Sequence, residues 1–225
     1  MTPVISPETK QQIAALTLAH HKPLIVCDVD EVVVHFLRAF EAWLDEHGCW
    51  LDPASFALNG NVKRKSDGQP IPVEELSHHF HAFFAARTAE FEEIENAARS
   101  LRHLSEVADV VMLTNLPFTY YEDRKRNLAK LGMSYPIVIN NGPKGPAMCE
   151  ITQASQAPVI FIDDTPSNVS SVCEALPTAH VVHFMQDARF GRHCGPIEGI
   201  SLRSDNWNET ADHIAKLIEV EGLDR

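Results

Sequence analysis

Short apolar runs alternate along the chain with segments whose apolar residues recur every three or four positions. The runs are typical of strands buried on both faces of a parallel sheet, and the periodic segments are typical of amphipathic helices. The first predicted strand begins at Leu24, and further predicted strands cover residues 109–113, 136–139, 159–162 and 180–184. Predicted helices cover about residues 35–47, 73–88, 91–104, 120–131, 146–154, 167–176 and 208–220.

This alternation predicts an α/β fold, in which a Rossmann-like, doubly wound parallel sheet carries helices on both faces. One stretch departs from the pattern, because prolines and the turn-forming pairs Asn-Gly and Asp-Gly precede a single helical segment. We therefore expect a core domain formed by residues 1–45 and 89–225, and a small, mainly helical insertion formed by residues 46–88.

Polar residues follow four of the predicted strands. In open parallel sheets, ligands bind beyond the carboxyl ends of the strands. Acidic residues follow the first and fourth strands, a hydroxyl and an amide follow the second, and a lysine lies in the loop after the third. In chain order these residues are Asp28, Asp30, Thr114, Asn115, Lys144, Asp163 and Asp164. Carboxylates gathered at one sheet edge commonly hold a cation or take part in catalysis.

The order of these residues resembles the four motifs of the haloacid dehalogenase superfamily. A single Asp-x-Asp or a threonine at a strand end is common, but the four motifs in order and in strand context form a specific pattern. The resemblance covers the chain apart from roughly residues 46–88, which occupy the position of the family's cap. The matching segments are Asp28-Val29-Asp30-Glu31-Val32, Leu113-Thr114-Asn115, Pro143-Lys144-Gly145 and Ile162-Asp163-Asp164-Thr165-Pro166-Ser167-Asn168.

The resemblance implies a hydrolase that acts through a covalent aspartyl-phosphate. Asp28 would be the nucleophile, and Asp30 would be the general acid and base. Thr114, the backbone amide of Asn115 and Lys144 would bind the transferred phosphate and offset its charge.

The resemblance also implies a Mg²⁺ site. The ion would contact the carboxylate of Asp28, the backbone carbonyl of Asp30 and Asp164, while Asp163 would support the site. The sequence leaves open which of the paired acids binds the metal directly. It also leaves open whether Glu31 adds a carboxylate near the metal or points outward.

Asp30 favours a phosphatase over the dehalogenating branch of the family. By resemblance, that branch uses one attacking aspartate without Mg²⁺, because a halide leaves without a proton. The predicted activity is therefore Mg²⁺-dependent hydrolysis of a small phosphomonoester, with a small phosphorylated metabolite as the partner. Dehalogenase or phosphotransferase activity and a non-catalytic phosphate-binding or signalling role remain alternatives. A response-regulator receiver is disfavoured, because its acidic pair lies on the first strand.

Composition adds limits on partners and location. The formal net charge of -12 disfavours general binding to nucleic acid or to an anionic membrane. The sequence contains no apolar run of membrane-spanning length, and its first ten residues lack the pattern of a signal peptide, so we expect a cytoplasmic protein. The basic cluster Lys63-Arg64-Lys65 is either a solvated turn or a contact for an anionic substrate. The pattern does not indicate an oligomeric state.

Overall fold

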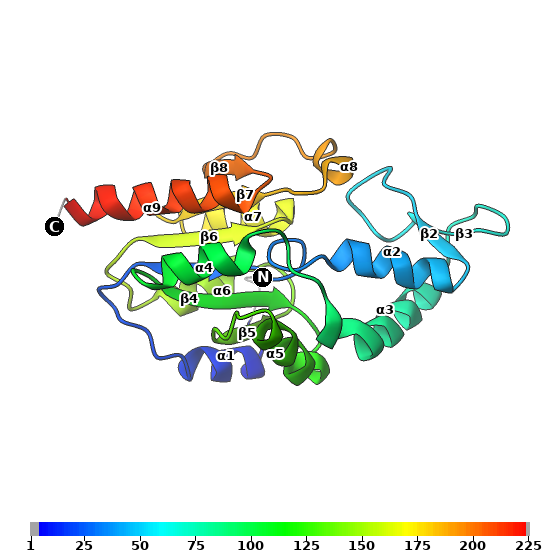
Figure 1. The fold of residues 1–225 in the computed structure, drawn as a ribbon, viewed down its shortest axis with the longest axis horizontal. Helices are drawn as coiled ribbons and strands as arrows, with labels where there is room; N and C mark the ends of the chain where they lie inside the picture. Colours follow the sequence, from blue (N-terminus) through cyan, green and yellow to red (C-terminus); the bar gives the residue numbers. More distant parts are fainter. Residues whose placement is uncertain (1–4, 224–225) are drawn as a thin grey trace.

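A six-stranded parallel sheet with the strand order β5-β4-β1-β6-β7-β8 forms the centre of the computed structural model, which describes residues 5–223 (Figure 1). The order runs outward from β1 in both directions, so the carboxyl end of β1 lies at the topological switch point where ligands bind in such sheets. The strands are β1 (Leu24–Cys27), β4 (Asp109–Asn115), β5 (Ile137–Asn140), β6 (Val159–Asp163), β7 (His180–Phe184) and β8 (Ile200–Ser204). The predicted doubly wound α/β fold is confirmed.

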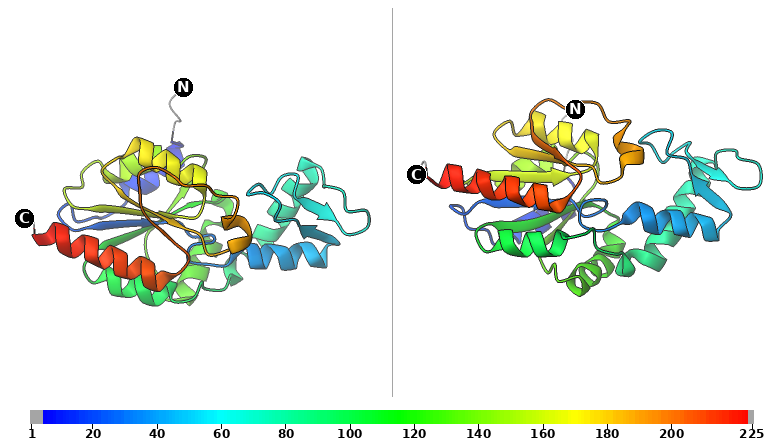
Figure 2. Two further views of the ribbon diagram at one scale, coloured as in Figure 1. Left: turned by 90° about the horizontal axis from the view of Figure 1, so that it is seen from above. Right: turned by 45° about the horizontal axis from the view of Figure 1, so that its top comes forward.

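Helices cover both faces of this sheet (Figure 2). Helices α1, α6 and α7 lie on one face, and α4, α5 and α9 lie on the other. Consecutive residues of β1 pack alternately into the two cores, since Leu24 and Val26 face one core and Ile25 and Cys27 face the other. This burial on both faces explains why β1 is a continuous apolar run. The helices are α1 (Pro7–Ala14), α4 (Ala97–Ser105), α5 (Tyr121–Lys130), α6 (Gly145–Thr152), α7 (Pro166–Ala175), the short α8 (Ala188–Gly191) and α9 (Trp207–Leu223).

A smaller lobe projects from the carboxyl edge of the sheet, at the right of Figure 1. It contains α2 (Phe36–Glu46), the antiparallel hairpin of β2 (Cys49–Leu51) and β3 (Val62–Arg64), and α3 (Val73–Arg87). Phe40 of α2 stacks on Phe80 of α3, with ring centroids 4.8 Å apart. Because α2 packs in this way onto α3, we use the name cap lobe for residues 36–87. The division of the chain into a core domain and an insertion at residues 46 and 88 stays a prediction. Residues 1–4 and 224–225 of the predicted core domain lie outside the described residues.

Most predicted strands and helices agree with the structure to within a few residues. The helix predicted from Phe91 is an exception, because α4 begins only after Asn96, whose φ of 70° is left-handed. Phe91 and Ile94 are nevertheless buried, so their spacing matched a helix without forming one. The sequence pattern also missed α1, the β2–β3 hairpin, α8 and the edge strand β8.

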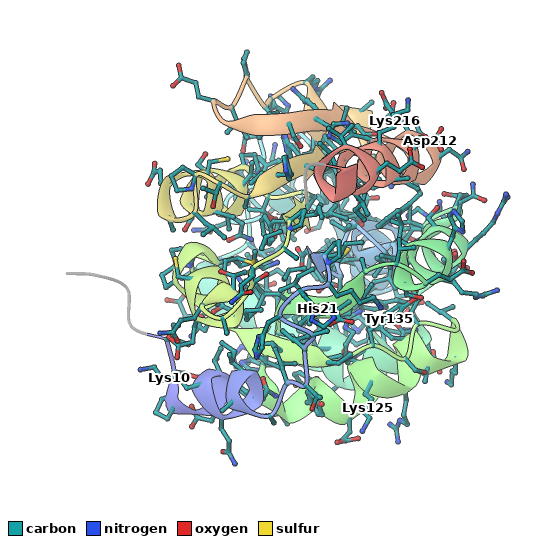
Figure 3. All side chains as sticks on the ribbon, turned by 90° about the vertical axis from the view of Figure 1, so that its left-hand side faces the viewer. Lys10, His21, Lys125, Tyr135, Asp212 and Lys216 are labelled. Carbon is teal, nitrogen blue, oxygen red and sulfur yellow. The ribbon has the colours of Figure 1, made fainter. Side chains whose placement is uncertain are left out.

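Several polar side chains lie at the end opposite to the cap lobe, among them Lys10, His21 and Lys216 (Figure 3). Lys125 of α5 and Asp212 of α9 are exposed there. Among residues 5–223, no helix combines the length and apolar character needed to cross a membrane.

Close packing of α6 on α7 leads to a first prediction. A Cβ atom at Gly145 would lie 2.4 Å from the carbonyl oxygen of Ser171. Gly145→Ala must therefore push α6 away from α7, and we expect the free energy of unfolding to fall by about 1–3 kcal/mol in urea denaturation. Gly195→Ala is the matched control, because nothing lies within 4 Å of its Cβ position. Equal losses in the two variants would contradict the prediction.

Candidate active site

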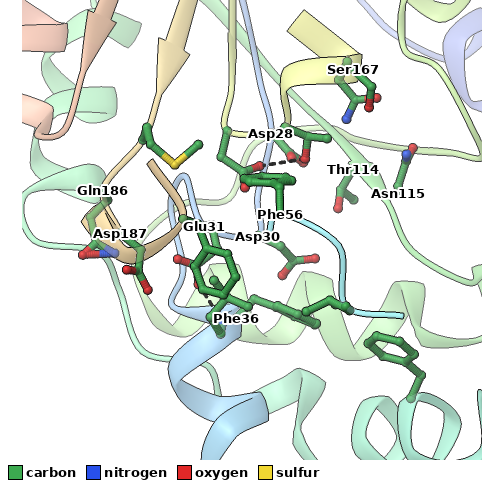
Figure 4. A pocket seen from close by; sticks show the side chains of 18 of the residues that line it. Asp28, Asp30, Glu31, Phe36, Phe56, Thr114, Asn115, Ser167, Gln186 and Asp187 are labelled. Atoms are coloured by element: carbon green, nitrogen blue, oxygen red, sulfur yellow. Dashed lines mark hydrogen bonds between the residues drawn. The ribbon is translucent and has the colours of Figure 1, made fainter. Parts of the chain in front are cut away.

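A cavity of about 520 Å³ lies between the carboxyl edge of the sheet and the cap lobe (Figure 4). Asp28 and Asp30 after β1, Thr114 and Asn115 at the end of β4, and Asp164 after β6 line its floor. Lys144 and Asp163 are buried directly behind this floor. The structure thus brings all seven predicted site residues together, and their chemical roles remain proposals.

The ammonium group of Lys144 joins two strand ends. Its Nζ lies 2.7 Å from Oδ1 of Asp28 and 2.6 Å from Oδ2 of Asp163. Burial alone would lower the pKa of Lys144, but the two carboxylates raise it above its ordinary value. Burial raises the pKa of Asp28 to about 6, although Lys144 opposes this shift. The lysine therefore stays charged, and its charge keeps two buried carboxylates together.

The two acids after β6 have different surroundings. Asp163 is fully buried, and its carboxylate accepts hydrogen bonds from the backbone amide of Thr165 at 2.8 Å and from the side chain of Asn168 at 3.3 Å. Asp164 is half-buried and lines the cavity, where its carboxylate accepts a hydrogen bond from the hydroxyl of Thr165 at 3.1 Å. Asp163 is thus bound by protein groups, whereas Asp164 faces the space that a ligand would occupy.

These acids form an oxygen-rich group suited to a hard cation. Ligand oxygens of Asp28, Asp163 and Asp164 all lie within 4.8 Å of one another. Burial and the neighbouring carboxylates of Asp163, Asp28 and Glu31 raise the pKa of Asp164 well above its ordinary value. A divalent cation would offset this repulsion, and carboxylate oxygens are the donors that Mg²⁺ prefers. The residues present therefore fit a Mg²⁺ ion.

Asp30 has a partner that the sequence analysis missed. Nη2 of Arg124, a fully buried residue of α5, lies 2.6 Å from Oδ1 of Asp30. The guanidinium also lies 4.9 Å from the centre of the Phe91 ring. Burial raises the pKa of Asp30, and the charge of Arg124 opposes that rise. Arg124 stands in a charged run of the sequence, but it lies one helical turn before the buried Leu128. This spacing places both side chains on the same helix face and could have identified Arg124 as a buried residue.

Thr114 presents an unpaired polar atom to the site. Its side chain is fully buried, and its Oγ1 has no hydrogen-bond partner among the described residues although Thr114 lines the cavity. Buried hydroxyl groups are normally paired, so this oxygen fits a ligand atom that donates to it or accepts from it. The neighbouring Asn115 is held by hydrogen bonds to the carbonyl of Gly142 and to the side chain of Asn140.

Glu31 faces the cavity and does not point into solvent. It adopts a left-handed backbone conformation with a φ of 59°, and its carboxylate accepts a hydrogen bond from the backbone amide of Leu37 at 2.6 Å. Burial raises the pKa of Glu31 to about 7, although the Leu37 amide opposes the shift. Of the two possibilities left open by the sequence, the structure thus supports a carboxylate near the floor.

The basic cluster of the cap lobe lies away from the cavity. Lys63 pairs with Asp52 at 2.5 Å, Arg64 pairs with Glu75 at 2.8 Å, and Lys65 pairs with an aspartate of α2. None of the three basic residues lines the cavity. These contacts favour an ion-paired surface cluster over a substrate contact, but the predicted turn holds only for Lys65, because Lys63 and Arg64 belong to β3.

A second group of possible metal ligands was not expected from the sequence. Cys49 of β2 and two residues of α3, Glu75 and His79, have ligand atoms within 4.8 Å of one another. Glu75 already pairs with Arg64, so we assign no ion to this group.

Removal of the buried ammonium gives a second prediction. Lys144→Met leaves Asp28 and Asp163 as buried carboxylates without their cation, so we expect the free energy of unfolding to fall by about 3–5 kcal/mol at neutral pH in urea denaturation. Lys125→Met, at an exposed position of α5, should change it by less than about 0.5 kcal/mol.

The deficit of Lys144→Met should also depend on pH. Burial raises the pKa of Asp28, and without the opposing ammonium the folded state binds more protons than the unfolded state. Its stability therefore rises as the pH falls, and the deficit should shrink between about pH 7.5 and about pH 5.5. A deficit that does not change with pH, or an equal loss in Lys125→Met, would contradict the assignment.

Comparison with known proteins agrees with the motif pattern. No protein-family model and no curated protein matches the chain. Solved structures do match, among them a HAD family hydrolase from Deinococcus radiodurans R1 with bound phosphate and sodium. Its sequence is 17% identical and its TM-score is 0.57, and the match covers 88% of this chain and 97% of that one.

Two further structures are similar over comparable lengths. The putative HAD-hydrolase YfnB from Bacillus subtilis, bound to magnesium, is 12% identical with a TM-score of 0.56, over 85% of this chain and 98% of that one. A putative beta-phosphoglucomutase from Thermotoga maritima is 14% identical with a TM-score of 0.54, over 87% of this chain and 99% of that one. At these identities the likeness establishes the fold, and the chain has the fold of the haloacid dehalogenase-like hydrolases.

Proposed function

We propose that the protein is a Mg²⁺-dependent phosphatase that hydrolyses a small phosphomonoester through an aspartyl-phosphate formed on Asp28. The observation that carries this proposal is the pairing of Asp28 with a buried ammonium beside the unpaired hydroxyl of Thr114. A nucleophilic carboxylate and donors for phosphate oxygens thereby converge on one cavity floor.

The proposed reaction has two displacements. The Asp28 carboxylate attacks phosphorus, and the phosphorus–oxygen bond to the alcohol breaks as Asp30 gives a proton to the leaving oxygen. Asp30 then takes a proton from water, which attacks the aspartyl-phosphate and releases inorganic phosphate. Arg124 holds Oδ1 of Asp30, so we assign the proton exchange to the second oxygen of that carboxylate.

Three groups would stabilise the transferred phosphoryl group. Lys144 offsets negative charge on Asp28 and phosphate, while the hydroxyl of Thr114 and the backbone amide of Asn115 hold phosphate oxygens. Bound Mg²⁺ would supply further neutralisation of the carboxylate and phosphate charges. We assign Asp28, the carbonyl of Asp30 and Asp164 as its protein ligands, and Asp163 as a supporting residue, because Asp163 is already hydrogen-bonded within the protein.

A phosphotransferase of the same fold is the second candidate, because one of the structurally similar proteins is a putative beta-phosphoglucomutase. Such an enzyme would share the attack by Asp28 and differ only in the acceptor, which would be an alcohol in place of water. Release of inorganic phosphate separates the two activities. The cytoplasmic location and the absence of nucleic-acid and membrane partners stay predictions from the sequence.

The roles of Asp28 and Asp30 can be separated by the leaving group. Asp28→Asn should abolish hydrolysis of both alkyl phosphates and acetyl phosphate. Asp30→Asn should lower kcat/KM for alkyl phosphates by roughly 10²–10⁴-fold, because kcat/KM reports the transfer to Asp28, in which the alcohol needs a proton. It should lower kcat/KM for acetyl phosphate less, because acetate leaves without a proton. The rate of phosphate release measures the hydrolysis of the alkyl phosphates and of acetyl phosphate. Asp212→Asn, exposed on α9, is the control (Figure 3). Hydrolysis that survives Asp28→Asn would contradict the mechanism.

Metal removal tests the assignment of the ion. Chelation should eliminate phosphate release, and added Mg²⁺ should restore it. Asp164→Asn should raise the Mg²⁺ concentration for half-maximal activity by roughly tenfold or more, because the variant loses a charged oxygen ligand. Asp212→Asn should leave that concentration unchanged. Activity in excess chelator, or an unchanged Mg²⁺ requirement in Asp164→Asn, would overturn the assignment.

A further inference from the structure

The cavity above the candidate active site has apolar walls. Phe36 of α2 and two residues of α3, Phe80 and Phe84, form one wall. Phe56 and Leu58, from the loop between β2 and β3, and Phe190 of α8 also line the cavity. The floor is polar, and the wall formed by these six residues is hydrocarbon, whereas Gln186 and Asp187 add polar groups elsewhere on the lining. The cavity therefore has a part that suits phosphate and a part that suits an apolar group.

The aromatic rings of these walls are arranged to receive another flat or branched hydrocarbon. The ring centroids of Phe36 and Phe84 lie 5.9 Å apart, and those of Phe80 and Phe84 lie 6.2 Å apart. Phe56 meets Phe190 edge to face, at 6.2 Å and 87°. Phe56, Phe80 and Phe84 are only half-buried, so apolar ring surface remains uncovered. Figure 4 shows the rings of Phe36 and Phe56 beside the carboxylates of the floor.

The same cavity offers no partner for a second anionic group. Among the described residues that line it there is no lysine, arginine or histidine, and Lys144 lies behind Asp28. Arg189, which precedes the lining residue Phe190, is paired with Asp187 at 2.6 Å and with Glu41 at 2.8 Å. Glu31 and Asp187 also line the cavity as acids. An additional carboxylate or phosphate on the substrate would lose water without gaining a cation, which is costly.

We infer that, if the chain is the phosphatase proposed above, its substrate is the monophosphate ester of a compact apolar alcohol that bears an aromatic ring or branched hydrocarbon and no second anionic group. Hydrolysis passes the phosphoryl group to Asp28 and then to water, and it releases the apolar alcohol with inorganic phosphate. The cavity volume of about 520 Å³ is within the range of small-molecule sites and leaves room for such an alcohol above the phosphate.

The test compares kcat/KM for 2-phenylethyl phosphate, glycerol 3-phosphate and 3-phosphoglycerate, with acetyl phosphate as the reference compound. Each apolar group placed in a fitting pocket contributes roughly 10–200-fold to discrimination. We therefore expect 2-phenylethyl phosphate to exceed glycerol 3-phosphate by about tenfold or more. The second anionic group should make 3-phosphoglycerate the poorest substrate of the three.

A matched pair of phenylalanine variants ties this preference to the wall. Phe56→Asn should lower kcat/KM for 2-phenylethyl phosphate by roughly tenfold or more relative to its effect on acetyl phosphate, since the polar side chain replaces an apolar contact. Phe118→Asn should change neither value, because Phe118 is 37% exposed and lies outside the cavity lining. Equal effects of the two variants would overturn the assignment of the wall.

The outcomes separate this inference from the proposed function. Hydrolysis of acetyl phosphate that requires Asp28, together with equal kcat/KM for the apolar and polar esters, would overturn the substrate class and leave the phosphatase standing. If no phosphate compound is hydrolysed, the proposed function fails. Calorimetry with 2-phenylethylphosphonate and methylphosphonate then decides whether the apolar site exists, since equal dissociation constants would overturn it.

Discussion

The ammonium of Lys144, buried between the carboxylates of Asp28 and Asp163, is the interaction on which the candidate site depends. It joins the ends of β1 and β6 to the start of α6, three segments that are far apart in the sequence. A buried ion pair is maintained only when its remaining hydrogen-bonding groups are also satisfied. The amide of Thr165 and the side chain of Asn168 donate hydrogen bonds to the carboxylate of Asp163. The amide of Val29 donates one to the carboxylate of Asp28.

The charge balance around this pair favours a bound cation. Asp28, Asp163, Asp164 and Glu31 are four acids near one buried ammonium, and burial together with the neighbouring carboxylates raises the pKa of Asp164. A phosphate dianion would meet the same repulsion at short range in a poorly screened cavity. Under the proposed function, a bound cation would offset this repulsion, and the fold provides oxygen ligands for it.

The sequence predicted the floor of the site well and its surroundings poorly, for a physical reason. Parallel strands end at one edge, so an abrupt change from apolar to polar residues was enough to place Asp28, Thr114 and Asp164 together. Nothing comparable locates a residue that reaches the site from a helix, and Arg124 was missed for this reason. Edge strand β8, with its alternating exposure, and helix α1 carry too weak an apolar pattern to be recognised against neighbouring loops.

In the cap lobe, the conspicuous basic residues are paired away from the cavity, whereas inconspicuous phenylalanines line it. The basic residues Lys63 and Arg64 stand out in an acidic chain, yet a charged side chain at the surface readily finds a nearby counter-ion, and both are paired within the lobe. The phenylalanines of α3 look like ordinary core residues. Phe83 is fully buried, but Phe80 and Phe84 lie four positions apart on one face and line the cavity. The apolar stripe of α3 is thus wider than its core contact requires, and the additional apolar residues line the cavity, where the inferred substrate would contact them.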